Sequence, residues 1–96
     1  MLEIYGTVHS RTLRVLWMAC ELELDFVHHP LDWQRCGQDA DYLALNPAGT
    51  IPALKDGDFV LAESLAINLY LAGREPRLWP QDEQRQALAL QWSFWA

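Results

Sequence analysis

The sequence has little positive charge. Its 96 residues include seven Lys and Arg against thirteen Asp and Glu, which gives a formal net charge of −6. The basic residues are scattered, whereas a surface that binds nucleic acid needs them clustered to contact phosphates. We therefore expect no nucleic acid among the partners of this chain.

Cysteines and long apolar runs are also scarce. Two cysteines are too few for a disulfide scaffold, and neither has a metal-binding spacing. Cys20 lies in an apolar helical stretch and is expected to be buried, whereas Cys36 lies in a polar segment and is expected to be exposed. The three histidines lack the neighbours that metal binding requires. No stretch approaches the ~20 apolar residues of a membrane span, so we expect a cytoplasmic protein with no metal and no membrane contact.

The first third of the chain has the pattern of a strand, a helix and a second strand. LEIY at 2–5 favours a β-strand and ends at Gly6. A helix is expected over 11–23, with Ser10 at its N-cap. The apolar residues with helical spacing in this stretch are Leu13, Leu16, Trp17, Cys20 and Leu24. DFVHHPL at 25–31 returns to a β pattern.

A hairpin and further helices follow. Two apolar runs flank Asp56-Gly57, a dipeptide that favours tight hairpin turns. A short helix is expected before the hairpin, over 39–46, and a longer one after it that stops at Gly73. A β-α-β unit makes its strands parallel, and a hairpin adds antiparallel ones. The order predicts an α/β, thioredoxin-like fold: β-α-β then β-β-α, a mixed four-stranded sheet and helices on both faces.

The last predicted helix, within 82–96, ends in QWSFWA. A single domain rarely leaves so much aromatic area uncovered. The helix therefore packs on a partner subunit, or the chain is a fragment whose continuation covers it; we favour the fragment.

Three motifs together carry a family resemblance: IYGTVHSRTLRVLW, NPAGTIPAL and ESLAINLYLA. In this order and spacing they resemble the N-terminal domain of soluble glutathione S-transferases, above all the bacterial, theta- and beta-like serine-type members. The resemblance implies a thioredoxin-like glutathione-binding domain over 1–76. It also implies that 77–96 form a linker and the first helix of a truncated all-helical C-terminal domain.

The resemblance assigns roles to two sites that straddle the hairpin. It implies that Ile51-Pro52 is a cis peptide bond, so that the backbone of Ile51 pairs with the cysteinyl residue of glutathione. TIP alone favours a trans proline at the start of an edge strand, and only the flanking motifs favour the cis form. It further implies that Glu63 meets the γ-glutamyl ammonium and that Ser64, at a helix N-terminus, meets the carboxylate. By themselves these two residues also fit a first-turn acid and a plain cap.

Ser10 is the catalytic candidate. It precedes the first helix, where a hydroxyl that donates to sulfur lowers the pKa of the glutathione thiol. Tyr5 and Thr7 are the alternatives, and Tyr5 also fits a core position. For the glycyl carboxylate the resemblance offers Gln38, Gln34 and Arg35, and the pattern does not choose among them. Thr50, just before Ile51, brings no cation there and is expected to contact glutathione.

The implied reaction is attack of the glutathione thiolate on an electrophilic small molecule, with glutathione as co-substrate and no metal. The resemblance also implies a homodimer. Two other classes stay open. One is a non-enzymatic interaction or dimerisation module, and the other is a glutathione-dependent isomerase or dehalogenase of the same family. A glutaredoxin-like thiol oxidoreductase is disfavoured because the first loop contains no cysteine.

Overall fold

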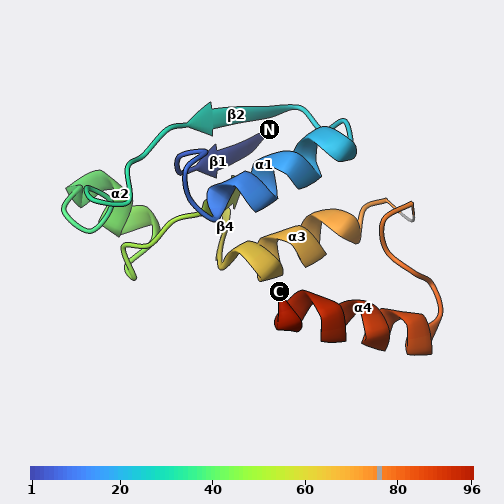
Figure 1. Cartoon of the computed structure of the whole chain (residues 1–96). Helices are drawn as coiled ribbons and strands as arrows, with labels where there is room; N and C mark the ends of the chain where they lie inside the picture. The colour runs from blue at the N-terminus through green and yellow to red at the C-terminus, as the bar shows by residue number, and fades with distance from the viewer. Residues whose placement is uncertain (76) are drawn as a thin grey trace.

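The computed structural model describes residues 1–75 and 77–96. Figure 1 shows one mixed sheet with helices packed against it. The strands lie in the order β2-β1-β3-β4, with β1 and β2 parallel and the other pairs antiparallel. The elements are β1 Leu2–Tyr5, α1 Thr12–Glu21, β2 Phe26–His29, α2 Ala40–Leu45, β3 Ala53–Asp56, β4 Phe59–Ala62, α3 Ser64–Ala72 and α4 Glu83–Trp95. The expected β-α-β and β-β-α order is confirmed.

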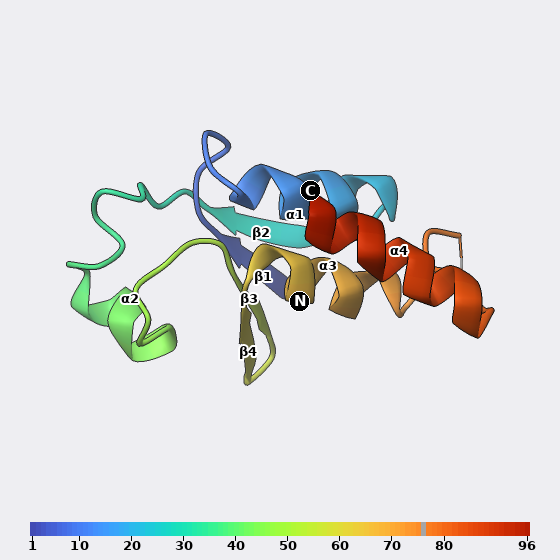
Figure 2. The ribbon, with the colours of Figure 1, turned by 60° about the horizontal axis from the view of Figure 1, so that its bottom comes forward.

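The main core lies between the sheet and the paired helices α1 and α3 (Figures 1 and 2). Because side chains alternate along a strand, Ile4 and Leu54 face these helices, and both are fully buried. Their neighbours Tyr5 and Ala53 belong to a second cluster with Tyr42 of α2. Helices therefore pack on both faces of the sheet, as expected.

The buried face of α1 differs from the predicted one. Val15, Leu16 and Ala19 are buried, whereas Leu13 and Trp17 are 49% and 65% exposed. Two apolar stripes run along this helix, and the one with the smaller side chains faces the core. The expected helix over 11–23 is also shorter at both ends.

Both cysteine expectations were wrong. Cys20 is exposed because it lies on the stripe of α1 that faces away from the core. Cys36 is buried at 4% exposure because its segment folds under α2, where it contacts Tyr42 and Ala53. Its Sγ donates a hydrogen bond of 3.2 Å to the carbonyl of Trp33. A polar segment can thus bury its one apolar thiol.

The hairpin turn lies one residue later than expected. Asp56 pairs with Phe59 at the end of the ladder, so the two loop residues are Gly57 and Asp58. Gly57 has a φ of 62°, a value that glycine adopts without strain. Gly73 ends α3 as expected, but as the C-cap with a φ of −63° rather than in the left-handed region.

Helix α4 is present within the expected 82–96, and none of its residues is buried. Its N-cap is Asp82, whose carboxylate accepts the backbone N–H of Arg85 at 3.1 Å. Trp92 and Trp95 contact each other edge to face, with ring centroids 5.8 Å apart. The expected domain boundary at residue 76 falls outside the described residues. Among residues 1–75 and 77–96, no helix has the length and hydropathy to cross a bilayer.

Candidate functional site

The loop between β1 and α1 is fixed by a close contact between Gly6 and Thr12. Gly6 has a φ of 134°, and a Cβ there would lie 2.9 Å from the Cβ of Thr12. The ring of His28 also bonds the carbonyl of Gly6, at 2.6 Å. Because only glycine tolerates both the φ and the contact, the loop has one well-defined path.

Ser10 lies at the end of this loop, half-buried and hydrogen-bonded within it. Its Oγ is 2.7 Å from the carbonyl of Thr7 and 2.8 Å from the Oγ1 of Thr12, and it accepts the backbone N–H of Thr12 at 3.1 Å. The N-cap of α1 is Arg11, one residue later than expected. The Ser10 hydroxyl still serves the first turn, because it takes up one of the unpaired N–H groups there.

The segment before Pro52 is held by α2. The carbonyl oxygen of Thr50 accepts hydrogen bonds from the hydroxyl of Tyr42 and from the Nδ2 of Asn46, the latter at 2.9 Å. Tyr42 and Asn46 are both buried. Burial raises the pKa of the Tyr42 phenol, so its hydroxyl stays protonated and remains a donor at neutral pH.

The Ile51-Pro52 peptide bond is cis, as the resemblance implies. Ile51 lies outside β3, and within residues 1–75 and 77–96 no hydrogen bond uses its backbone N–H or C=O. Backbone groups are normally paired with protein or water. This pair of groups is therefore available to an extended peptide ligand.

The start of α3 faces the same place. Ser64 is the first residue of α3 and is 7% exposed, while Glu63 before it is exposed with a φ of 75° and a ψ of 117°. Such a φ costs of order 1–3 kcal/mol for a residue with a side chain. The first N–H groups of the helix lack partners within it, which favours an anion at this end.

These elements meet at one cavity of about 210 Å³. The site residues predicted from the sequence that line it are Thr50, Ile51, Pro52, Glu63 and Ser64, and Arg11 is the sixth residue of its wall. Ser10 and Gln38 do not line it. Arg35 and Thr7 line another cavity, of about 460 Å³, between the first loop and the segment after β2.

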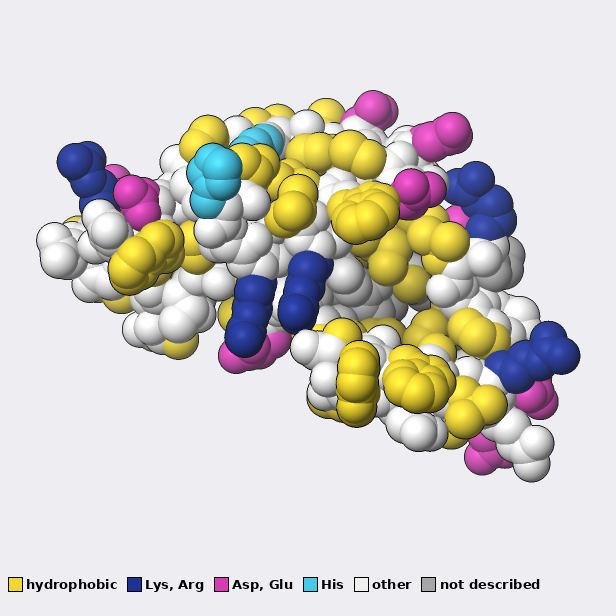
Figure 3. Space-filling model, in the orientation of Figure 1, with side chains coloured by type: hydrophobic (Ala, Val, Ile, Leu, Met, Phe, Trp, Pro, Cys, Tyr) yellow, Lys and Arg dark blue, Asp and Glu magenta, His cyan; other side chains and the backbone are white. Residues whose placement is uncertain are grey.

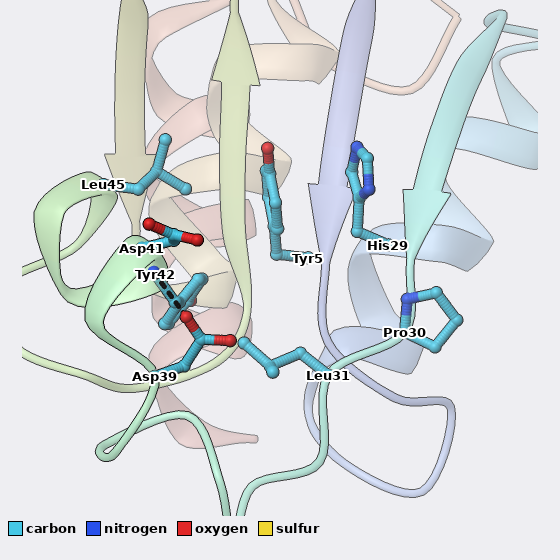
Figure 4. A pocket seen from close by; sticks show the side chains of 8 residues that line it. All are labelled: Tyr5, His29, Pro30, Leu31, Asp39, Asp41, Tyr42 and Leu45. Atoms are coloured by element: carbon cyan, nitrogen blue, oxygen red, sulfur yellow. Dashed lines mark hydrogen bonds between the residues drawn. The ribbon is translucent and has the colours of Figure 1, made fainter.

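Figure 4 shows a different cavity, of about 280 Å³, beneath α2. Tyr5 points into it from β1, its ring stacked on His29 with centroids 4.5 Å apart. Burial raises the pKa of Tyr5, and the nearby carboxylate of Glu3 raises it further. This cavity shares no lining residue with the one at Pro52. Tyr5 is therefore badly placed to act on a ligand held by Ile51.

Comparison with known proteins agrees with this arrangement. Residues 10–74 match the family described as the glutathione S-transferase N-terminal domain. The chain belongs to the glutathione S-transferase family. It is 39% identical over 103 aligned residues to glutathione S-transferase GstB of Escherichia coli, covering all of this chain and 49% of that protein. It is 47% identical over 75 residues to glutathione S-transferase 3 of Zea mays, covering 76% of this chain and 34% of that protein. The chain thus spans half or less of these curated relatives.

Solved structures of glutathione S-transferases share the fold. The theta-class enzyme of Xanthomonas axonopodis pv. citri, solved with glutathione bound, superposes with a TM-score of 0.89 at 36% identity, over 98% of this chain and 47% of that one. A homologue from Sulfitobacter, also with bound glutathione, gives a TM-score of 0.81 at 33% identity, over 91% and 44%. The expected likeness to bacterial, theta-like members is confirmed.

Four residues of the site were missed or left without a role. Thr12, Tyr42 and Asn46 hold the first loop and Thr50 in place, and Arg11 supplies a cation to the cavity wall. Only the proximity of Arg11 to Ser10 was visible in the sequence. Among the described residues, no group of three or more His, Cys, Asp and Glu side chains could hold a metal ion.

Proposed function

We propose that this chain binds glutathione in the cavity at Pro52. The observation that carries the proposal is the unpaired backbone of Ile51 in the same cavity wall as Glu63 and Ser64. The cysteinyl residue of glutathione would pair with the N–H and C=O of Ile51 as a strand does. Two solved relatives were determined with glutathione bound, which supports the same ligand here.

The far end of the ligand carries an ammonium and a carboxylate side by side. In the proposed pose the carboxylate of Glu63 takes the ammonium, while Ser64 and the free N–H groups of α3 take the carboxylate. The φ of Glu63 is the sort of local strain that persists at binding sites, because the surrounding structure enforces it. Gln34, Arg35 and Gln38 remain the proposed candidates for the glycyl carboxylate, and Thr50 remains a proposed glutathione-binding residue.

In the whole protein we infer glutathione transferase activity, in which the bound thiolate attacks an electrophilic carbon. Ser10 stays the proposed thiol-activating residue, since a hydroxyl beside sulfur favours the thiolate. Should Ser10→Ala leave the pH dependence of thiolate absorbance unchanged, Ser10 would act only as a loop-fixing residue.

The proposed setting follows the family. We infer a homodimer in the cytoplasm that takes part in detoxification of electrophiles; two free cysteines and the absence of a membrane-spanning helix in the described residues fit that setting. We also infer that residues 1–76 form the glutathione-binding domain and that 77–96 begin an all-helical one. The wholly unburied α4 supports this division.

Isothermal titration with glutathione tests the binding proposal. The unaltered chain should bind, and Glu63→Gln should weaken the affinity roughly tenfold, because one charge-assisted bond is lost. Glu83→Gln, an exposed acid in the first turn of α4, is the matched control and should bind as the unaltered chain does. A folded chain that takes up no glutathione would favour the interaction-module alternative instead.

A further inference from the structure

The hydroxyl of Ser10 is already engaged in its own loop. A serine has one O–H to donate, and acceptors lie at 2.7 Å on Thr7 and 2.8 Å on Thr12. Thr12, which also donates its backbone N–H to Ser10, is fully buried and fixed against Gly6. To donate to a ligand sulfur, Ser10 must give up one of these bonds.

The side chain of Arg11, the next residue, is not held by such hydrogen bonds. It is exposed, and within residues 1–75 and 77–96 its side chain takes part in no hydrogen bond or ion pair. It is the one basic residue in the wall of the cavity at Pro52. It therefore brings an unpaired positive charge to the place where the ligand is expected.

Arg11 also stands at the junction of two cavities. A larger one, of about 470 Å³, shares Arg11, Glu63 and Ser64 with the first and extends between α3 and the end of α4. Figure 3 shows this hollow, with basic side chains on the α1 side and hydrophobic ones on α4. A sulfur held at Ile51 with an electrophile in the larger cavity would thus react beside Arg11.

The other charged groups of the ligand have partners in the two cavities, so Arg11 remains available to the sulfur. Glu63, the residue before α3, has the one acidic side chain in either wall, and the ligand's ammonium would neutralise it. The ligand's γ-glutamyl carboxylate is met by Ser64 and the start of α3. Of these two cavities Arg14 lines only the larger one, and the end of the chain contributes the uncharged side chains of Ser93, Phe94 and Ala96 to it.

We propose that the Arg11 guanidinium lies beside the sulfur of bound glutathione and is a catalytic residue that holds the thiol as its anion; this rests on the proposed function. A cation near a thiol favours the thiolate and lowers the thiol pKa. The thiol proton leaves to water, and the sulfur keeps its electron pair. That pair then forms the bond to the electrophilic carbon, whose leaving group departs with the electrons of the bond that breaks.

The test follows the thiolate absorbance of bound glutathione as a function of pH in Arg11→Gln and in the matched control Arg14→Gln. Arg11→Gln should raise the thiol pKa by about one unit, whereas Arg14→Gln should leave it in place. Arg11→Lys should restore part of the shift, because the charge is kept. Circular dichroism confirms that each variant is folded.

S-methylglutathione has no ionisable thiol. Its affinity therefore shows whether Arg11 contacts the sulfur or a carboxylate of the ligand. Arg11→Gln should change that affinity by less than about threefold, since a contact to the sulfur anion is absent from this ligand. An equal loss of affinity for both ligands with an unchanged thiol pKa would place Arg11 on a carboxylate and overturn the proposal. If the unaltered chain bound neither ligand, the proposed function itself would fail, and the inference with it.

Discussion

The cavity at Pro52 is supported by the buried, hydrogen-bonded side chains of Tyr42 and Asn46, whereas along α4 the largest side chains are in solvent. Ser64 at the cavity is 7% exposed, while Trp92 and Trp95 of α4 are 60% and 79% exposed. Thr50 receives two hydrogen bonds, from Tyr42 of α2 and from its C-cap Asn46, but no residue of α4 is buried. The two regions therefore differ in what fixes them: the cavity depends on the core beneath it, and α4 depends on its own backbone.

This difference indicates that the cavity at Pro52, and not α4, is the part of the chain suited to ligand recognition. A site built on strands and helix termini with buried supports is held in place before a ligand arrives. An amphipathic helix with no buried face contributes little to stability on its own. Substitutions in the two regions should therefore have unequal effects on folding.

The largest expected difference is in the core. Ile67 of α3 is fully buried and Leu88 of α4 is 54% exposed. Ile67→Ala should lower the free energy of unfolding by about 2–5 kcal/mol, and Leu88→Ala by less than about 0.5 kcal/mol. Urea denaturation measures both. Similar losses would mean that α4 is part of the same cooperative core.

The first loop comes next. Gly6→Ala should cost about 1–3 kcal/mol, because the residue has a φ of 134° and its new Cβ would meet Thr12. Gly73→Ala is the control: φ is −63°, and the nearest atoms to a Cβ lie 3.5 Å away. It should be neutral or stabilise by up to ~1 kcal/mol. Thermal unfolding of the two variants measures the difference. If Gly6→Ala lost no stability, the close contact with Thr12 would be refuted.

A smaller effect is expected from two tyrosine substitutions, which distinguish a residue that supports the binding site from one that only stabilises the fold. Tyr42→Phe removes the bond to Thr50, and Tyr70→Phe removes a bond of 2.6 Å to Asp56 at the hairpin end. Each should cost about 1 kcal/mol of unfolding free energy. Only Tyr42→Phe should also weaken glutathione binding in a titration. Equal affinities in the two variants would show that Thr50 needs no support from α2.

The smallest expected effect is on the folding stability at low pH, through Asp56. The hydrogen bond from Tyr70, together with the Arg74 guanidinium, holds the pKa of Asp56 below its ordinary value of 3.8. A lowered pKa stabilises the fold above the ordinary value, and this contribution is lost as the pH falls through the folded-state pKa. Asp56→Asn should therefore lose less stability than the unaltered chain between about pH 5 and pH 3. Acid unfolding of both proteins is followed by circular dichroism. An equal loss of stability in the two would contradict the assignment.

Local signals in the sequence indicated the order of elements along the chain, and the family resemblance indicated the residues of the cavity wall. A turn dipeptide placed the hairpin within one residue, and TIP with the following Glu63 and Ser64 marked the cavity wall. All four described helices were also expected, α1 from its apolar spacing and α2 and α3 from the residues that end them. The fold and most of the binding wall were therefore predictable.

The supports of the site were not predictable, because they join residues through space. The bond from Tyr42 to the carbonyl of Thr50 links a helix to a loop, and nothing in the pattern around Tyr42 indicates it. The face of α1 was misjudged because Val15 and Ala19 are less conspicuous than Trp17, yet fit closer to the sheet. Hydropathy alone did not distinguish the two stripes, and the same ambiguity misplaced Cys20.

The most direct test of the account is amide chemical-shift mapping by NMR as glutathione is added. The backbone signals of Ile51, Ser64 and Glu63 should move in proportion to occupancy, because these groups are expected to bond the ligand. The indole signals of Trp92 and Trp95 should stay in place. Shifts confined to α4, or to the cavity beneath α2, would contradict the assignment of glutathione to the cavity at Pro52.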